Sequence, residues 1–145
     1  MDVVKSKVWD VIVIGGGPSG STVARKLALA KKKVLLLDAS IFPRVKLCAG
    51  WVTKQALFDL ELNPDEYPLT IQPFSSIFID CGGKSYETKW DEPASYGIVR
   101  YEFDHFLLNR AQQSGVSIRC GIRVRDIEFG KDFVTVSTEK ETFKS

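Results

Sequence analysis

The chain has 145 residues, of which 44% are apolar and 26% are charged, and its formal net charge is +2. This length and composition are typical of one soluble globular domain with a substantial core. The near balance of 20 basic and 18 acidic residues supplies no strongly basic face, so we expect no nucleic-acid partner.

The cysteines and the apolar runs indicate the cellular compartment. Cys48, Cys81 and Cys120 lie far apart and form no CxxC pair, so we expect neither a disulfide framework nor a metal site. No apolar run reaches the ~20 residues that span a bilayer. The first ten residues lack the apolar stretch of a signal peptide. We therefore expect a cytoplasmic protein and leave peripheral membrane contact open.

The first forty residues predict a βαβ unit. Residues 8–14 are short, apolar and β-branched, as in a buried strand. Residues 21–30 show helical spacing of apolar side chains, and residues 33–38 form a second apolar run. A strand, a glycine turn, a helix and a second strand predict an α/β fold with a parallel sheet.

The rest of the chain predicts a mixture of hairpins, loops and one long helix. Residues 75–90 alternate around a Gly-Gly pair, and residues 102–114 are amphipathic and precede Gly115. The remaining predicted elements, in chain order, are a loop at 39–53, a short helix at 53–60, a loop at 91–97, a strand at 116–120 and a hairpin at 124–138.

The glycine turn predicts a dinucleotide site. Gly15 permits a sharp exit from the strand, Gly17 lets a pyrophosphate approach the backbone, and Gly20 allows close helix packing. The helix start adds free N–H groups and the positive end of the dipole. Asp38 ends the second strand at about the spacing expected of a carboxylate that binds a ribose 2′-hydroxyl, which disfavours NADP. A plain tight turn, with Asp38 as a cap, is the alternative, and the spacing does not separate FAD from NAD.

A family resemblance favours FAD. "DVIVIGGGPSGSTVARKLA" with "VLLLD" resembles the amino-terminal FAD-binding segment of the glutathione-reductase-like flavoproteins, in the branch of geranylgeranyl reductases and aromatic-hydroxylase-type monooxygenases. "FPRVKLCAG", "VRYEFDHFLLNRA" and "GVSIRCGIRVRDIEF" extend the resemblance over nearly the whole chain. It implies a Rossmann-like FAD-binding domain over residues 1–145, with a parallel sheet and a β-meander. Residues 74–98 would then be part of a second, β-rich substrate domain.

The same resemblance implies cofactor-binding roles for individual residues. Those implied at the pyrophosphate are Gly15, Gly17, Pro18, Ser19 and Gly20. Asp38 would hold the ribose, and Val124 would meet the adenine through its backbone. Those implied at the flavin end are Arg44, Cys48, Ala49 and Gly50, with Arg100 contacting the cofactor where its helix begins.

Some of these roles have a competing explanation. A surface ion pair is the alternative for Arg44 and Arg100, and a small packing residue is the alternative for Cys48. Cys48 is also the one candidate for a catalytic group. Trp51 departs from the family pattern, and His105 is expected to face solvent.

The resemblance also implies an activity. It points to an FAD-dependent oxidoreductase that reduces C=C bonds of a prenyl or isoprenoid substrate through reduced flavin, with NAD(P)H as a candidate electron donor. A flavin-dependent monooxygenase or halogenase of the same fold is one alternative, and a non-catalytic FAD-binding fragment is another. The family's downstream Gly-Asp motif has no match, so we expect the amino-terminal part of a longer enzyme, cut inside or just after the meander. The substrate would be a small molecule or prenyl lipid, and the oligomeric state stays open.

Overall fold

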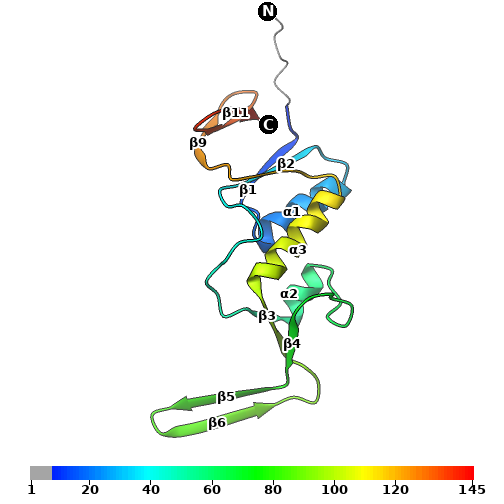
Figure 1. The fold of residues 1–145 in the computed structure, drawn as a ribbon, viewed down its shortest axis with the longest axis vertical. Coiled ribbons are helices and arrows are strands. Elements are labelled where there is room, and N and C mark those ends of the chain that lie inside the picture. The colour runs from blue at the N-terminus through cyan, green and yellow to red at the C-terminus, as the bar shows by residue number, and fades with distance from the viewer. Residues whose placement is uncertain (1–7) are drawn as a thin grey trace, which may run out of the picture. The chain divides into compact units, whose positions relative to one another are not determined.

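The computed structural model describes residues 8–145 (Figure 1). The segment 1–7, which contributes to the argument against a signal peptide, lies outside the described residues. Contacts divide the chain into two units. The first runs to Arg44 and resumes at Asp104, and the second comprises Val45–Phe103. No helix among the described residues is long and apolar enough to cross a membrane.

The first unit contains a parallel sheet in the order β1-β2-β8, which confirms the α/β fold. Its strands are β1 (Val11–Ile14), β2 (Val34–Asp38) and β8 (Ser117–Cys120), and α1 (Pro18–Leu29) connects the first two. Each apolar residue of β2 is at most 1% exposed, as expected of a central strand covered on both faces. The strand β1 begins three residues later than predicted, because Val8 forms only an isolated bridge.

Alternate residues of β2 enter two different cores. Val34 and Leu36 pack with residues of α1 and α3 (Arg100–Gln113). Leu35 and Leu37 point to the other face and pack with Trp9 and Val136. Because successive side chains of a strand point to opposite faces, one strand anchors both cores of this unit.

A three-stranded meander covers the second of these cores. It consists of β9 (Val124–Phe129), β10 (Val134–Thr138) and β11 (Thr142–Lys144), all antiparallel. The first two strands confirm the predicted hairpin. The third was not predicted as an element. Thr138 closes the turn that leads to it, since its hydroxyl accepts hydrogen bonds from the backbone N–H groups of Lys140 and Glu141.

The second unit is built on a small antiparallel sheet in the order β3-β7-β4. The sequence analysis assigned loop to two of its strands and no element to the third. They are β3 (Trp51–Thr53), β4 (Ile71–Phe74) and β7 (Ser95–Ile98). Each has only three or four residues, and two contain Pro73 or Gly97, residues that weaken a strand signal.

Other parts of this unit agree with the sequence analysis. The helix α2 (Lys54–Asp59) begins after Thr53, whose hydroxyl accepts a hydrogen bond from Ala56 N. The hairpin of β5 (Ser76–Cys81) and β6 (Lys84–Lys89) is confirmed. Its two central residues, Gly82 and Gly83, both have positive φ, as the predicted tight turn requires.

The long helix α3 belongs to both units by residue number. It begins at Arg100, two residues before the predicted start, and the turn after it uses Gly115 at a φ of +98°. Its buried face includes the predicted Phe103, Leu107 and Ala111. It also includes Asp104, which the sequence analysis did not place in the core.

Candidate functional site

The glycine turn lies between β1 and the start of α1. Gly15 has a φ of +105°, a conformation that residues with side chains rarely adopt. Its N–H donates a 2.7 Å hydrogen bond to the carbonyl oxygen of Leu37, so the turn continues the pairing of β1 with β2. This confirms the predicted sharp exit from the strand.

Close packing explains two more of the glycines. A Cβ placed on Gly20 would lie 1.8 Å from the carbonyl oxygen of Gly15, which excludes any side chain and confirms the predicted helix contact. A Cβ on Gly16 would lie 3.2 Å from Leu108 Cδ1 and 3.3 Å from Phe42 Cζ. Gly16 is buried, and the sequence analysis gave it no role.

Gly17 differs from its neighbours. Its φ of −69° is ordinary, and the nearest atom to a Cβ there would be Arg44 Nη2 at 3.7 Å, a normal contact distance. Neither the backbone nor the packing of the first unit therefore requires glycine at this position. A ligand that approaches the backbone would supply the requirement.

The start of α1 can bind an anion. Gly17 is the N-cap residue and makes no side-chain capping hydrogen bond, and Pro18 occupies the first turn. No acidic side chain stands in that turn, and Ser19 is exposed. The first-turn N–H groups and the positive end of the helix dipole thus remain available to a phosphate.

Asp38 lies beside this turn, where the ribose of a dinucleotide was predicted. Its Oδ2 accepts a 2.6 Å hydrogen bond from Gly16 N, and its Oδ1 accepts one of 2.6 Å from Ser40 N. The carboxylate therefore joins the end of β2 to the glycine turn. Asp38 thus caps backbone N–H groups, as the alternative explanation expected, and it lies beside the glycine turn. Binding of a ribose by Asp38 stays a prediction.

An ion pair with a fully buried carboxylate lies close to Gly17. Arg44 Nη2 is 3.2 Å from Asp104 Oδ2, and the two side chains are 17% and 0% exposed. The guanidinium carbon of Arg44 also lies 4.9 Å from the ring centroid of Phe42. The ion pair considered as the alternative for Arg44 is therefore present, but its carboxylate is buried rather than at the surface.

Asp104 is the charged residue near the glycine turn that sequence reasoning missed. It stands inside the quoted helix motif, between Phe103 and His105, but received no role. An acidic residue beside the buried Phe103 was the available signal, since a buried carboxylate needs a partner.

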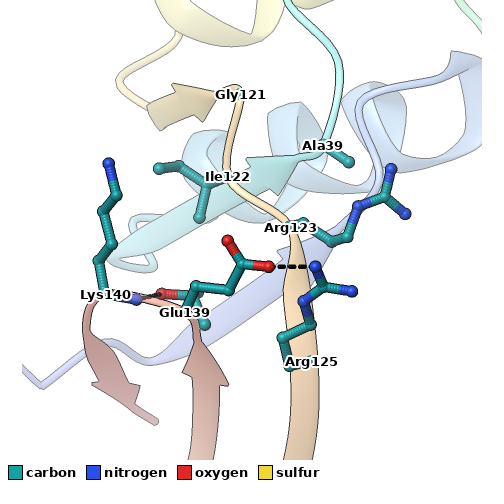
Figure 2. A pocket seen from close by; sticks show the side chains of 8 residues that line it. Ala39, Gly121, Ile122, Arg123, Arg125, Glu139 and Lys140 are labelled. Atoms are coloured by element: carbon teal, nitrogen blue, oxygen red, sulfur yellow. Dashed lines mark hydrogen bonds and ion pairs between the residues drawn. The ribbon is translucent and has the colours of Figure 1, made fainter.

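A cavity of about 270 Å³ lies at the carboxyl end of β2, where Ala39 follows Asp38 (Figure 2). Its lining residues are Ala39, Gly121, Ile122, Arg123, Arg125, Thr138, Glu139 and Lys140. Figure 2 shows Glu139 and Arg125 pointing toward one another, and these side chains form an ion pair. The hydrogen bond and charge of Arg125 lower the pKa of Glu139. Val124, the predicted adenine contact, lies in the chain between two of the lining arginines.

The predicted flavin-end residues belong mainly to the second unit. Cys48 is exposed, and its Sγ accepts a 3.4 Å hydrogen bond from Gly50 N. Gly50 has a φ of +72°, and a Cβ there would lie 2.2 Å from the carbonyl oxygen of Ile98, so packing on β7 requires glycine. Ala49 is exposed and Arg100 is partly buried at the start of α3. Roles of these four residues toward a flavin stay predictions.

His105 does not simply face solvent. It is partly buried and lines a cavity of about 240 Å³ with Phe42 and Cys120, among other residues of the first unit. Within residues 8–145, no three His, Cys, Asp or Glu side chains come together as metal ligands.

Comparisons with known proteins show what this chain resembles. No family model matches the chain. It is 33% identical to an uncharacterised protein of Methanosarcina barkeri over 98% of this chain and 36% of that protein. It is 31% identical to a flavin-dependent halogenase of Armillaria mellea, covering 85% of this chain and 26% of the halogenase. A menaquinone reductase of Mycolicibacterium smegmatis is 30% identical over 81% of this chain and 30% of the reductase.

Solved structures share the fold. A geranylgeranyl bacteriochlorophyll reductase-like protein of Thermoplasma acidophilum matches with a TM-score of 0.81 and 19% identity, over 95% of this chain and 37% of that one. The myxobacterial chondrochloren halogenase, described as FAD-dependent, matches with a TM-score of 0.74 and 25% identity, over 95% of this chain and 35% of that one. The chain thus spans about a quarter to a third of the length of the curated relatives it matches.

The parallel sheet, the meander and the glycine turn together define a Rossmann-type domain of the FAD-binding flavoproteins. In sequence the chain is similar to flavin-dependent halogenases and menaquinone reductases, and it shares its fold with a geranylgeranyl-reductase-like protein. The fold class and the family resemblance predicted from the sequence are confirmed.

Proposed function

We propose that this chain binds FAD and forms the cofactor-binding part of a flavin-dependent oxidoreductase. The observation that carries the proposal is the start of α1. Gly17 is the N-cap residue of α1, and the helix has no side-chain capping hydrogen bond from it. The packing around Gly17 would tolerate a side chain, and Arg44 Nη2 lies beside it. A glycine with no structural need, an uncapped helix and a guanidinium together favour a phosphate ligand.

The residues of the first unit suit the adenosine and pyrophosphate half of the cofactor. The N–H groups of Ser19 and Gly20 would bind the pyrophosphate. Arg44, which the resemblance implies at the flavin end, lies beside Gly17, so we propose it as a further pyrophosphate ligand. The carboxylate of Asp38 would accept hydrogen bonds from ribose hydroxyls. The backbone of Val124 would contact the adenine beside the cavity that Ala39 and Arg123 help to line.

For the flavin half of the cofactor, the candidates are Cys48, Ala49, Gly50 and Arg100, on the strength of the family resemblance. FAD supplies the electron-transfer chemistry when it is bound, and the protein supplies binding, orientation and exclusion of water.

For the whole protein we favour reduction of a C=C bond in a prenyl or isoprenoid substrate, with NAD(P)H as the electron donor. The reductase-like structural neighbour and the menaquinone reductase relatives support this reaction. A lipid substrate would bring a cytoplasmic enzyme into peripheral contact with a membrane.

Halogenation, or another oxygen-dependent reaction, is the second candidate. Relatives named as flavin-dependent halogenases or tryptophan 2-halogenase are 29–32% identical to the chain. A non-catalytic FAD-binding role is the third. An assay of the whole protein with a prenyl substrate and reduced flavin, in parallel with an aromatic substrate, halide and oxygen, distinguishes the three.

The cofactor proposal has a direct test. The 145-residue chain is titrated with FAD, FMN and riboflavin, and binding is followed by flavin fluorescence. FAD is expected to bind more tightly than the other two, and ADP is expected to compete with it, because the contacts proposed for the first unit are with the adenosine diphosphate half. Equal affinity for FAD and riboflavin, or no competition by ADP, would contradict the proposal.

A further inference from the structure

The ion pair between Arg44 and Asp104 is not explained by a contribution to the stability of the fold. The Asp104 carboxylate is 0% exposed, and burying a charge is costly even when its partner is close. Apolar side chains of similar volume often stabilise a core as well or better. A buried pair of this kind therefore invites a search for what else it does.

The guanidinium of Arg44 is held close to the glycine turn by several contacts. Its Nη2 lies 3.2 Å from Asp104 Oδ2 and 3.7 Å from the position of a Cβ on Gly17. The ring of Phe42 lies 4.9 Å from the guanidinium carbon. The same ring closes on Gly16, with Cζ at 3.3 Å from the position of a Cβ there. Arg44, Phe42 and Asp104 thus form a fixed group against the turn.

We propose that Asp104 is a positioning residue that holds the Arg44 guanidinium at the glycine turn, ready for the pyrophosphate of the dinucleotide. The proposal rests on the proposed function. A guanidinium has five N–H donors in a planar fork, so its contact with one carboxylate leaves donors for phosphate oxygens. A side chain held before the ligand arrives loses little further conformational entropy on binding, and affinity rises accordingly.

This role predicts the direction in which a substitution of Asp104 changes ligand affinity. Asp104 is an anion close to the site of a polyanionic ligand, so its charge alone opposes binding. If charge were its only effect, Asp104→Asn would bind ADP and FAD more tightly than the unmodified chain. If Asp104 positions Arg44, the same substitution weakens binding, because the guanidinium loses its fixed orientation.

The test measures the dissociation constants of FAD by fluorescence and of ADP by competition. We expect Asp104→Asn to raise both by about tenfold, the effect of one lost charge-assisted hydrogen bond. The exposed Glu128→Gln makes the same change in net charge on β9 and is expected to leave both constants unchanged. Equal or tighter binding by Asp104→Asn overturns the positioning role.

A double-mutant cycle separates positioning from general damage to the fold. Arg44→Met is expected to weaken FAD binding at least as much as Asp104→Asn, and the double variant no more than Arg44→Met alone. Additive losses would show that Asp104 does not act through Arg44. If Asp104→Asn does not fold, Arg44→Lys is used, which keeps the charge and loses the planar fork. Unchanged ADP and FAD binding by a folded Arg44→Lys overturns the proposal.

Binding of FAD and ADP by the unmodified chain distinguishes failure of the proposed function from failure of the positioning role. If it binds neither FAD nor ADP, the proposed function fails and the positioning role fails with it. If it binds both and Asp104→Asn binds them as tightly, only the positioning role fails.

Discussion

The N–H of Gly16 donates a 2.6 Å hydrogen bond to Oδ2 of Asp38, and this bond joins the second residue of the glycine turn to the end of the neighbouring strand. The other carboxylate oxygen accepts a bond of the same length from Ser40 N. Asp38 therefore shapes the turn and is also the residue proposed to bind the ribose. A substitution there affects both the ligand and the loop.

Asp38→Ala is expected to weaken FAD binding by about 1–3 kcal/mol, the scale of a hydrogen bond to a charged group. Asp38→Asn keeps one acceptor oxygen and is expected to show a smaller loss. Fluorescence titration gives both values, and thermal unfolding reports the cost of losing the two backbone contacts. Unchanged FAD affinity in Asp38→Ala would remove this carboxylate from the cofactor site.

Gly17 and Gly20 form a matched pair of tests. A methyl group on Gly17 meets nothing closer than 3.7 Å, whereas one on Gly20 would lie 1.8 Å from a carbonyl oxygen. Gly17→Ala is therefore expected to keep the circular dichroism spectrum and the unfolding temperature but to lose FAD, because the pyrophosphate meets the new methyl group. Gly20→Ala is expected to lose stability first.

The larger Gly17→Val variant should behave like Gly17→Ala, with a more complete loss of flavin. If Gly17→Ala and Gly17→Val both bind FAD at full stoichiometry, the turn has only a structural role. A stable Gly20→Ala would show instead that α1 can move away from the turn.

Cys48 has a spectroscopic prediction. If its thiol lies near the isoalloxazine, Cys48→Ser changes the absorption spectrum of bound flavin without changing the unfolding temperature. Cys81→Ser, at the β5-β6 turn, and Cys120→Ser, at the end of β8, are the controls and are expected to leave the spectrum unchanged. Identical spectra for all three variants would exclude Cys48 from the flavin environment.

The pKa of Cys120 predicts a slow and pH-dependent alkylation. Burial raises the pKa of this thiol, a hydrogen bond from the Phe42 backbone lowers it, and the charge of Asp38 raises it again, with a net increase. At neutral pH less of it is thiolate, so iodoacetamide should label Cys120 more slowly than the exposed Cys81. Peptide mass spectrometry measures each rate, and the rate at Cys120 should rise as pH is raised.

The same experiment in Asp38→Asn has a defined direction. Loss of the negative charge lowers the pKa of Cys120, so its labelling at a given pH should become faster, while that of Cys81 stays unchanged. Slower or equal labelling of Cys120 would contradict the coupling between Asp38 and this thiol.

Local patterns in the sequence predicted the elements that form the glycine turn. The apolar runs of β1 and β2 predict buried strands, and the glycines between them predict the turn. Gly15 is required by its positive φ and Gly20 by contact with the backbone of Gly15. These requirements act over a few neighbouring residues, so spacing alone reveals them. The Gly82-Gly83 hairpin was predictable for the same reason.

The sequence by itself therefore determined the βαβ unit, the family resemblance and the candidate role of Asp38 beside the turn. Only the tertiary structure decided which side chains complete that site. Asp104 lies 60 positions after Arg44 in the chain, and no local spacing rule connects a loop guanidinium to a carboxylate on a distant helix. Burial decides that pairing, because a charge removed from water must find an opposite charge wherever the fold places one. The strands β3, β4 and β7 were missed for a related reason, since such short segments are stabilised by partners far away in the chain.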